Sequence, residues 1–186
     1  MKDEKMKAVD KKAEYMTSLS GDRLVSKTHG RIVFRGLIDT LEAEVIEAQV
    51  LTSQLGEEAI CHGLGEILDC LRALMAAEVK ETPFPPPFLF GMDAEEIHRL
   101  SHNTEGSLGA VPMPAYTQGP LAARLNKLRA KVREAELLAV KVFGPGESTQ
   151  GTDASDFNPR EDIILALNRL SSALWWLYCK YLSDRN

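Results

Sequence analysis

The stretch RIVFRGLIDTLEAEVIEAQVLTSQ, residues 31–54, decides the fold class of this chain. Large apolar side chains recur in it at spacings of three and four residues, at Phe34, Leu37, Ile38, Leu41, Val45 and Ala48. That spacing is typical of an amphipathic helix with one buried face. It therefore predicts a long helix over residues 31–54, whose apolar stripe needs other helices to cover it.

Other segments carry the same periodicity and predict long helices at residues 57–81, 120–143 and 159–182. Pro120 suits the first turn of its helix, and Asn158 is expected to cap the last one, with Glu161 and Asp162 in the first turn. A shorter helix is predicted over residues 93–102. Because no segment shows the alternation of a strand, we expect an all-α fold, an antiparallel bundle of four long helices plus a shorter one.

The length of 186 residues indicates a single domain. Residues 1–17, which alternate charges, are expected to form a flexible tail, and residues 18–186 are expected to form the helical domain. Gly, Ser and Pro predict that the connecting segments are loops, at residues 18–30, 103–119 and 144–158.

Composition excludes several classes of protein. With 22 basic and 27 acidic side chains, the net charge of −5 gives no reason to expect nucleic-acid binding. The longest uncharged stretch, residues 106–123, contains three prolines and cannot form a membrane helix. The charged N-terminus has no apolar core of a secretory signal, and the cysteines Cys61, Cys70 and Cys179 are expected to be reduced thiols. The sequence therefore predicts a cytosolic protein without a membrane partner.

Polar side chains interrupt three of the predicted helices. They share faces or lie together in these sets: Arg31, Arg35, Asp39 and Glu42; Arg129, Arg133 and Glu136; Asn168, Arg169, Ser171 and Ser172. Charged stripes of this kind are typical of solvated faces with pairs three or four residues apart. The alternative is that the three sets converge on one polar site. The Asn168 set favours a site, because large apolar residues surround it and an unpaired buried polar group is costly.

Common catalytic motifs are absent from the sequence: it has neither a phosphate-binding P-loop nor a Gly-rich dinucleotide motif. Its Cys-His pair and next cysteine have a poor zinc spacing, and its single Glu-x-x-His lacks the second copy of a di-iron bundle. We expect core, partner-facing or surface roles for Cys61, His62, Cys70, Glu95, His98, Trp175 and Trp176.

Three motifs together resemble those of the ATP:corrinoid adenosyltransferases. They are Lys27-x3-Arg31-x4-Gly36-x2-Asp39-x-Leu41, the helix LRAKVREAE at residues 128–136, and Asn168-Arg169-Leu170-Ser171, in the same order. The stretches MTSLSGDRLVSKTHGRIVFRGLIDTLEAE, IHRLSHN, LRAKVREAELLAVKVF and ILALNRLSSALW are similar to the ethanolamine-utilisation branch of that family. The resemblance covers residues 14–182 and implies a helical bundle, commonly a homotrimer with active sites between subunits.

The resemblance also implies a reaction. In this family, cob(I)alamin attacks the 5′ carbon of ATP, which yields adenosylcobalamin and triphosphate. The protein has to align the two substrates and stabilise the leaving triphosphate, so its task is positioning and electrostatics. The expected cofactors are ATP and Mg²⁺, with cobalamin as substrate. A reductase and a B12-dependent lyase are the expected partners, in the cytoplasm or in a bacterial microcompartment.

Residue roles follow from the same resemblance. The implied ATP-binding residues are Thr17, Ser20, Gly21, Asp22, Lys27, Arg133 and Asn168. The implied catalytic residues are Arg133, Asn168, Asp39 and Arg129, of which Asp39 and Arg129 match a salt-bridged pair at the subunit boundary. Supporting roles are expected for Arg31, Arg35 and Glu136. A corrinoid-facing apolar wall is expected from Met113, Tyr116 or Trp175.

The sequence departs from the family pattern at several points. The Gly-rich phosphate loop is shortened to Leu19-Ser20-Gly21-Asp22, Glu134 replaces a second arginine, and Ser172 replaces an acidic residue. No Cys or His precedes Ser18, where some ethanolamine-branch members carry a metal motif. Two explanations stay open: corrinoid activation without metal, or a preceding segment.

Two other functions remain as alternatives. One is a non-catalytic bundle that binds corrinoid or a partner helix as a scaffold, which would need the apolar surfaces but not Lys27, Arg133 and Asn168 together. The other is a ferritin-like metal protein, which would contain bound iron.

Overall fold

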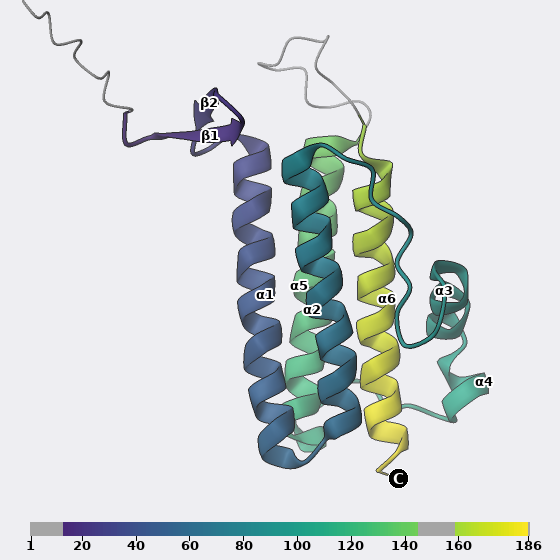
Figure 1. Cartoon of the computed structure of the whole chain (residues 1–186). Helices are drawn as coiled ribbons and strands as arrows, with labels where there is room; N and C mark the ends of the chain where they lie inside the picture. The colour runs from purple at the N-terminus through teal and green to yellow at the C-terminus, as the bar shows by residue number, and fades with distance from the viewer. Residues whose placement is uncertain (1–12, 145–158, 186) are drawn as a thin grey trace, which may run out of the picture.

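The computed structural model describes residues 13–144 and 159–185. Four long helices, α1 (Gly30–Leu55), α2 (Glu58–Lys80), α5 (Gly119–Phe143) and α6 (Glu161–Ser183), lie side by side as a bundle (Figure 1). The shorter α3 (Ala94–His102) lies beside α6, outside the bundle. The predicted fold class is confirmed, and the bounds of the predicted helices agree with these to within two residues.

The four long helices pack against antiparallel neighbours. Helix α1 packs against α2 and α5, and α6 packs against the same two helices. A tight turn at Gly56, whose φ of 71° suits glycine, joins α1 to α2. The chain then returns along α6, through α3, to the other end of the bundle before α5 begins (Figure 1). This return lets α2 and α5 run in the same direction on opposite corners of the bundle.

The core is the apolar stripe that the periodicity predicted. Phe34, Ile38, Leu41 and Val45 of α1 are completely buried. Phe34 meets Phe143 of α5 edge to face, with ring centroids 5.1 Å apart. Among the described helices, none combines the length and the apolar composition that crossing a bilayer requires.

A β-hairpin precedes the bundle, and the expectation of a strand-free loop there is wrong. Strands β1 (Met16–Ser20) and β2 (Arg23–Ser26) pair antiparallel around a turn at Gly21 and Asp22. Gly21 has a φ of 51°, which glycine adopts at no steric cost. Strand β1 crosses the boundary expected at residue 17. The hairpin lies at the end of the bundle where α1 begins (Figure 1).

Two further expectations need comment. The segment 103–119 is not only loop, because it contains α4 (Thr104–Leu108) and the 3-10 helix η1 (Tyr116–Gln118). Helix α6 begins at Glu161 after Arg160, with Glu161 and Asp162 in its first turn as predicted. The expected cap Asn158, most of the expected tail and nearly all of the loop 144–158 lie outside the described residues.

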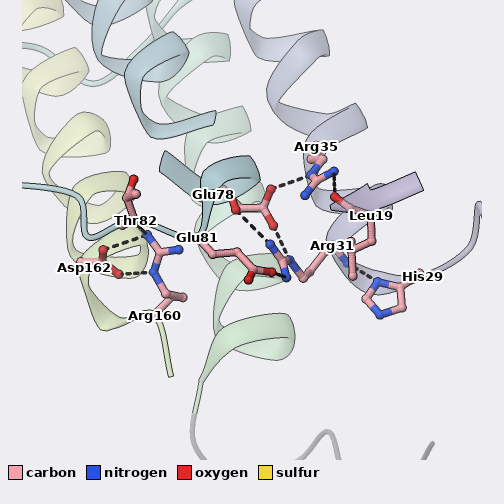
Figure 2. A network of polar contacts seen from close by, with 9 residues as sticks. All are labelled: Leu19, His29, Arg31, Arg35, Glu78, Glu81, Thr82, Arg160 and Asp162. Atoms are coloured by element: carbon pink, nitrogen blue, oxygen red, sulfur yellow. Dashed lines mark hydrogen bonds and ion pairs between the residues drawn. The ribbon is translucent and has the colours of Figure 1, made fainter. Parts of the chain in front are cut away.

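The first turn of α6 is bonded to the segment that follows α2. Asp162 accepts a hydrogen bond from the backbone nitrogen of Phe84 at 2.7 Å and one from Arg160 Nε at 2.9 Å. Arg160 also donates through Nη2 to the backbone oxygen of Thr82 at 2.8 Å (Figure 2). Burial alone would raise the pKa of Asp162, but these hydrogen bonds hold it below its usual value.

This lowered pKa predicts how stability depends on pH. Ionised Asp162 stabilises the fold above its unfolded pKa of about 4, and that contribution is lost as the pH falls through the folded value. We therefore expect Asp162→Asn to be less stable than the unaltered chain at neutral pH, with the difference shrinking in acid. Urea unfolding at a series of pH values measures this, with the exposed Asp69→Asn as control. A difference that stays constant down to about pH 2 would contradict the argument.

Candidate functional site

The hairpin gathers the side chains predicted to bind phosphate. Thr17 and Ser20 lie in β1, Gly21 and Asp22 form the exposed turn, and Lys27 is exposed just after β2. The turn is closed by Ser18, whose Oγ donates to the Gly21 oxygen at 2.6 Å. These residues therefore lie on one small element that leads into the N-terminus of α1, where helix N–H groups favour an anion.

A buried carboxylate joins the hairpin to the bundle (Figure 2). Glu78 of α2 is fully buried, and its two oxygens accept from Nε of Arg31 and Nε of Arg35 on α1, the latter at 2.5 Å. Arg35 Nη1 donates to the backbone oxygen of Leu19 in β1 at 2.8 Å, and the Leu19 side chain is itself buried. Glu81 accepts from Arg31 Nη1 at 2.6 Å. We call Glu78, Arg31, Arg35 and Glu81 the Glu78 clamp.

The clamp changes the interpretation of the first polar stripe. Arg31 and Arg35 are not a solvated face, because only 18% and 14% of their side chains are exposed and both pair with Glu78. Two arginines and two glutamates cancel in charge, so the group offers little net attraction to a phosphate. Its contacts instead fix where β1 lies on the bundle. Asp39, on the same helix, remains exposed.

His29 caps the helix that follows the hairpin. Its Nδ1 accepts from the Arg31 backbone nitrogen at 3.2 Å. Burial and the nearby Arg31 charge lower the pKa of His29, which favours the neutral ring that can accept this bond. Neither His29 nor Glu78 was identified from the sequence.

A second polar group lies on the flank of the bundle between α5 and α6. Asn168 Nδ2 donates to Glu136 Oε1 at 2.9 Å, and Arg169 Nη1 donates to Asn168 Oδ1 at 2.6 Å. Arg169 also reaches Glu95 of α3 at 3.4 Å. The amide of Asn168 is thus held in one orientation from both sides. Asn168 therefore lies in a bonded polar group, and its contact with a nucleotide stays a prediction.

The remaining predicted catalytic residues do not join this group. Arg133, one turn before Glu136 on α5, is exposed. Arg129 bonds to Asn126 Oδ1 at 3.2 Å and places its guanidinium 5.4 Å from the ring centroid of Trp175. Within one chain, Asp39 therefore makes no salt bridge to Arg129 among the described residues. Trp175 in turn stacks on Tyr178, at 5.2 Å between ring centroids.

The two other residues expected to face the corrinoid lie on the segment before α5. Met113 and Tyr116 are 82% and 92% exposed. Gln118, at the end of this segment, bonds to the buried Tyr178 on α6, which places the segment near Trp175. In a single chain, the three predicted polar sets do not meet as one site. The predicted site residues instead lie in three places: on the hairpin, in the bonded set Glu136, Asn168 and Arg169, which we call the flank group, and on the segment with Met113 and Tyr116.

The thiols take no part in these groups, whereas Glu95 contacts Arg169. Burial raises the pKa of Cys70 to about 12 and that of Cys179 to about 11, so both are protonated at neutral pH. Cys61 is half-buried, and Glu95 is exposed except for its contact with Arg169. No cluster of three metal-ligating side chains occurs in residues 13–144 or 159–185.

Comparison with known proteins identifies the family. The family described as cobalamin adenosyltransferase matches residues 9–181. The chain belongs to this family. No solved structure matches it significantly.

Named relatives give the same family. The corrinoid adenosyltransferase EutT of Salmonella typhimurium strain LT2 is 33% identical over 168 residues, which cover 90% of this chain and 58% of that protein. The proteins of the same name from Escherichia coli strains K12 and CFT073 show the same identity and coverage. The chain therefore spans 58% of the length of these curated relatives.

For this adenosyltransferase-family chain, the clamp makes a prediction about stability. Glu78→Ala leaves Arg31 and Arg35 buried without their shared carboxylate, so we expect a loss of about 3–5 kcal/mol in the free energy of unfolding. Glu81→Ala, which removes a half-exposed partner of the same Arg31, is expected to cost less than about 1 kcal/mol. Urea denaturation followed by circular dichroism measures both. Equal losses in the free energy of unfolding for the two variants would contradict the argument that the burial of Glu78 makes its ion pairs more important than that of Glu81.

Proposed function

We propose that this chain transfers the 5′-deoxyadenosyl group of ATP to cob(I)alamin, which yields adenosylcobalamin and triphosphate, within ethanolamine utilisation. The observation that carries the proposal is the family match over residues 9–181. The Co(I) electron pair forms the cobalt–carbon bond at C5′, and the C5′–O bond breaks with its electrons leaving on triphosphate. The pathway is proposed from the EutT relatives.

The hairpin is proposed to hold the triphosphate. Lys27 is exposed at the open end of the hairpin, where its backbone nitrogen bonds to the Tyr15 oxygen, and the exposed turn at Gly21 lies at the opposite end. Binding of the triphosphate by a positive side chain and by N–H groups stabilises the leaving group as charge develops on it. Mg²⁺ binds mainly through substrate phosphates and waters, with one or two carboxylates, so Asp22 in the turn is the side chain available to it.

The flank group is proposed to hold the nucleoside. Asn168 is oriented by Glu136 and Arg169 and has one amide N–H left to donate. Arg133 is exposed on α5, one turn before Glu136, and is proposed to contact the phosphates. Exposed Met113 and Tyr116, with Trp175, are proposed to face the corrinoid.

The exposed positions of Asp39 and Arg133 support an active site completed by a second copy, in a homotrimer. Asp39 lies on α1 without an ion pair among the described residues, while Arg129 lies across on α5. A contact between Asp39 of one copy and Arg129 of another would satisfy both and bring the polar groups together. A reductase that supplies Co(I) and a B12-dependent lyase that takes the product are the proposed partners.

The proposal predicts the effect of removing one arginine. Arg133→Ala is expected to lower the rate of adenosylcobalamin formation by about a hundredfold to a thousandfold, because it removes one charge-stabilising contact in the transition state. Arg124→Ala, which removes another α5 arginine paired with Glu47, is expected to keep the rate. Anaerobic absorbance assays with ATP, Mg²⁺ and chemically reduced cobalamin measure both. An unaltered chain that makes no product above the uncatalysed rate would overturn the proposed reaction and favour the scaffold.

Subunit mixing tests where the site lies. Asp39→Ala and Asn168→Ala chains are each expected to be nearly inactive. If the two residues act from different copies, mixed oligomers contain some sites with neither change, and activity returns on mixing after mild dissociation. Mixing each variant with itself is the control. No recovery in mixtures shown to be exchanged would contradict an active site between subunits.

A further inference from the structure

Gln118 occupies a junction that no sequence motif marked. It ends η1, just before α5, and its side chain is half-buried. Its Oε1 accepts from the backbone nitrogen of Ala115 at 2.8 Å and from Tyr178 Oη at 2.8 Å. Its Nε2 donates to the backbone oxygen of Met113 at 3.0 Å. One amide thus holds two backbone groups of segment 109–118 and one side chain of α6.

The partner on α6 is rigid. Tyr178 is completely buried, and its ring stacks on Trp175 with an interplanar angle of 18°. Trp175 also carries the Arg129 guanidinium over its ring. The contacts therefore run without a break from Met113 through Gln118, Tyr178 and Trp175 to Arg129.

The segment is supported at both of its ends. In the described structure, the bond between Gln118 and Tyr178 joins residues 109–118 to α6. Just before them, Ser183 on α6 donates to the Leu108 backbone oxygen at 3.0 Å, and Val111 packs against the core. Gln118 also lines a hollow of about 520 Å³ next to the C-terminal end of α6, with Tyr181 and Arg185 among the other lining residues. Between Val111 and α5, beside this open space, Gln118 supplies the side-chain hydrogen bonds that hold the backbone around the exposed Met113 and Tyr116.

We propose that Gln118 is a positioning residue for the corrinoid: bonded to Tyr178, it fixes the segment that presents Met113 and Tyr116 relative to Trp175 and Arg129. This inference rests on the proposed function, because it takes these side chains as the corrinoid-facing wall. It assigns Gln118 no contact with the reacting atoms. Its effect is on the shape of the corrinoid side, not on the ATP side, whose hairpin lies at the other end of the bundle (Figure 1).

Two substitutions isolate the tether. Tyr178→Phe removes one hydroxyl and keeps the ring that stacks on Trp175, while Gln118 Oε1 keeps its bond to Ala115. Gln118→Ala removes all three bonds. The matched control is Tyr181→Phe, the same change one turn later on α6, at a buried ring that lies under the Arg185 guanidinium instead.

The measurement compares the effect of each substitution on the KM for cob(I)alamin with its effect on the KM for ATP. We expect Tyr178→Phe to raise the KM for cob(I)alamin about fivefold, the value of one ordinary hydrogen bond, with the KM for ATP unchanged. Gln118→Ala is expected to raise it further, and Tyr181→Phe to leave both constants unchanged. A general loss of structure would lower kcat and alter both constants, and thermal unfolding followed by circular dichroism identifies it.

A binding measurement separates this inference from the proposed reaction. Each variant is titrated with cob(II)alamin in the presence of ATP, and the visible absorbance of the corrinoid is followed. Weaker binding by Tyr178→Phe and Gln118→Ala supports the positioning role even if the unaltered chain gives no turnover, a result that overturns only the proposed reaction. Folded variants that bind cob(II)alamin as the unaltered chain does, or an unaltered chain that binds none, overturn the positioning role.

Discussion

The buried carboxylate of Glu78 is the contact on which the candidate ATP side depends. A buried carboxylate is tolerated only when it is paired, and Glu78 of α2 is paired twice, with Arg31 and Arg35 of the neighbouring helix α1. Because Arg35 also bonds to the backbone of β1, the elements α1, α2 and β1 meet at the Glu78 clamp (Figure 2). The position of the hairpin thus follows from the helix packing. The proposed binding of triphosphate by this hairpin needs such a support, because the phosphates have to be held in a fixed position relative to the second substrate.

Helix α6 carries residues of each of the other polar contacts along its length. Asp162 begins it, Asn168 and Arg169 follow, and Tyr178 lies near its end. Sixteen residues at 1.5 Å each separate Asp162 from Tyr178 by about 24 Å, which is longer than the distance over which one side chain can act. The nucleoside contact proposed for Asn168 therefore lies between the phosphate end and the corrinoid end. One straight helix sets the order in which the parts of two substrates can be arranged.

The periodic helices were predictable, whereas the elements that depend on distant partners were not. Spacings within residues 31–54 identified α1 because its burial repeats along one segment. The hairpin was missed because β1 and β2 have at most five residues each and are largely polar, although Gly21-Asp22 between two short runs is a known hairpin signal. Glu78 looks like any surface glutamate near a helix end, and only the packing of α1 against α2 shows its burial. The family motifs named Asn168, but its partners Glu136 and Arg169 needed coordinates to show their hydrogen bonds.

Separate networks hold the two proposed substrate sides: the Glu78 clamp holds the hairpin, and the bonds of Gln118 hold the segment with Met113 and Tyr116. No hydrogen bond or ion pair of the described residues connects the Glu78 clamp to the bonds of Gln118. In the proposed reaction, attack by cobalt on C5′ requires the two substrates to be aligned within a fraction of an ångström. The helices between the two networks therefore have to keep the networks in a fixed relative position. Rigid helix packing transmits position over that distance without a polar contact. In the proposed reaction, the Glu78 clamp therefore fixes the triphosphate side and the bonds of Gln118 fix the corrinoid side, each without a polar contact to the other among the described residues.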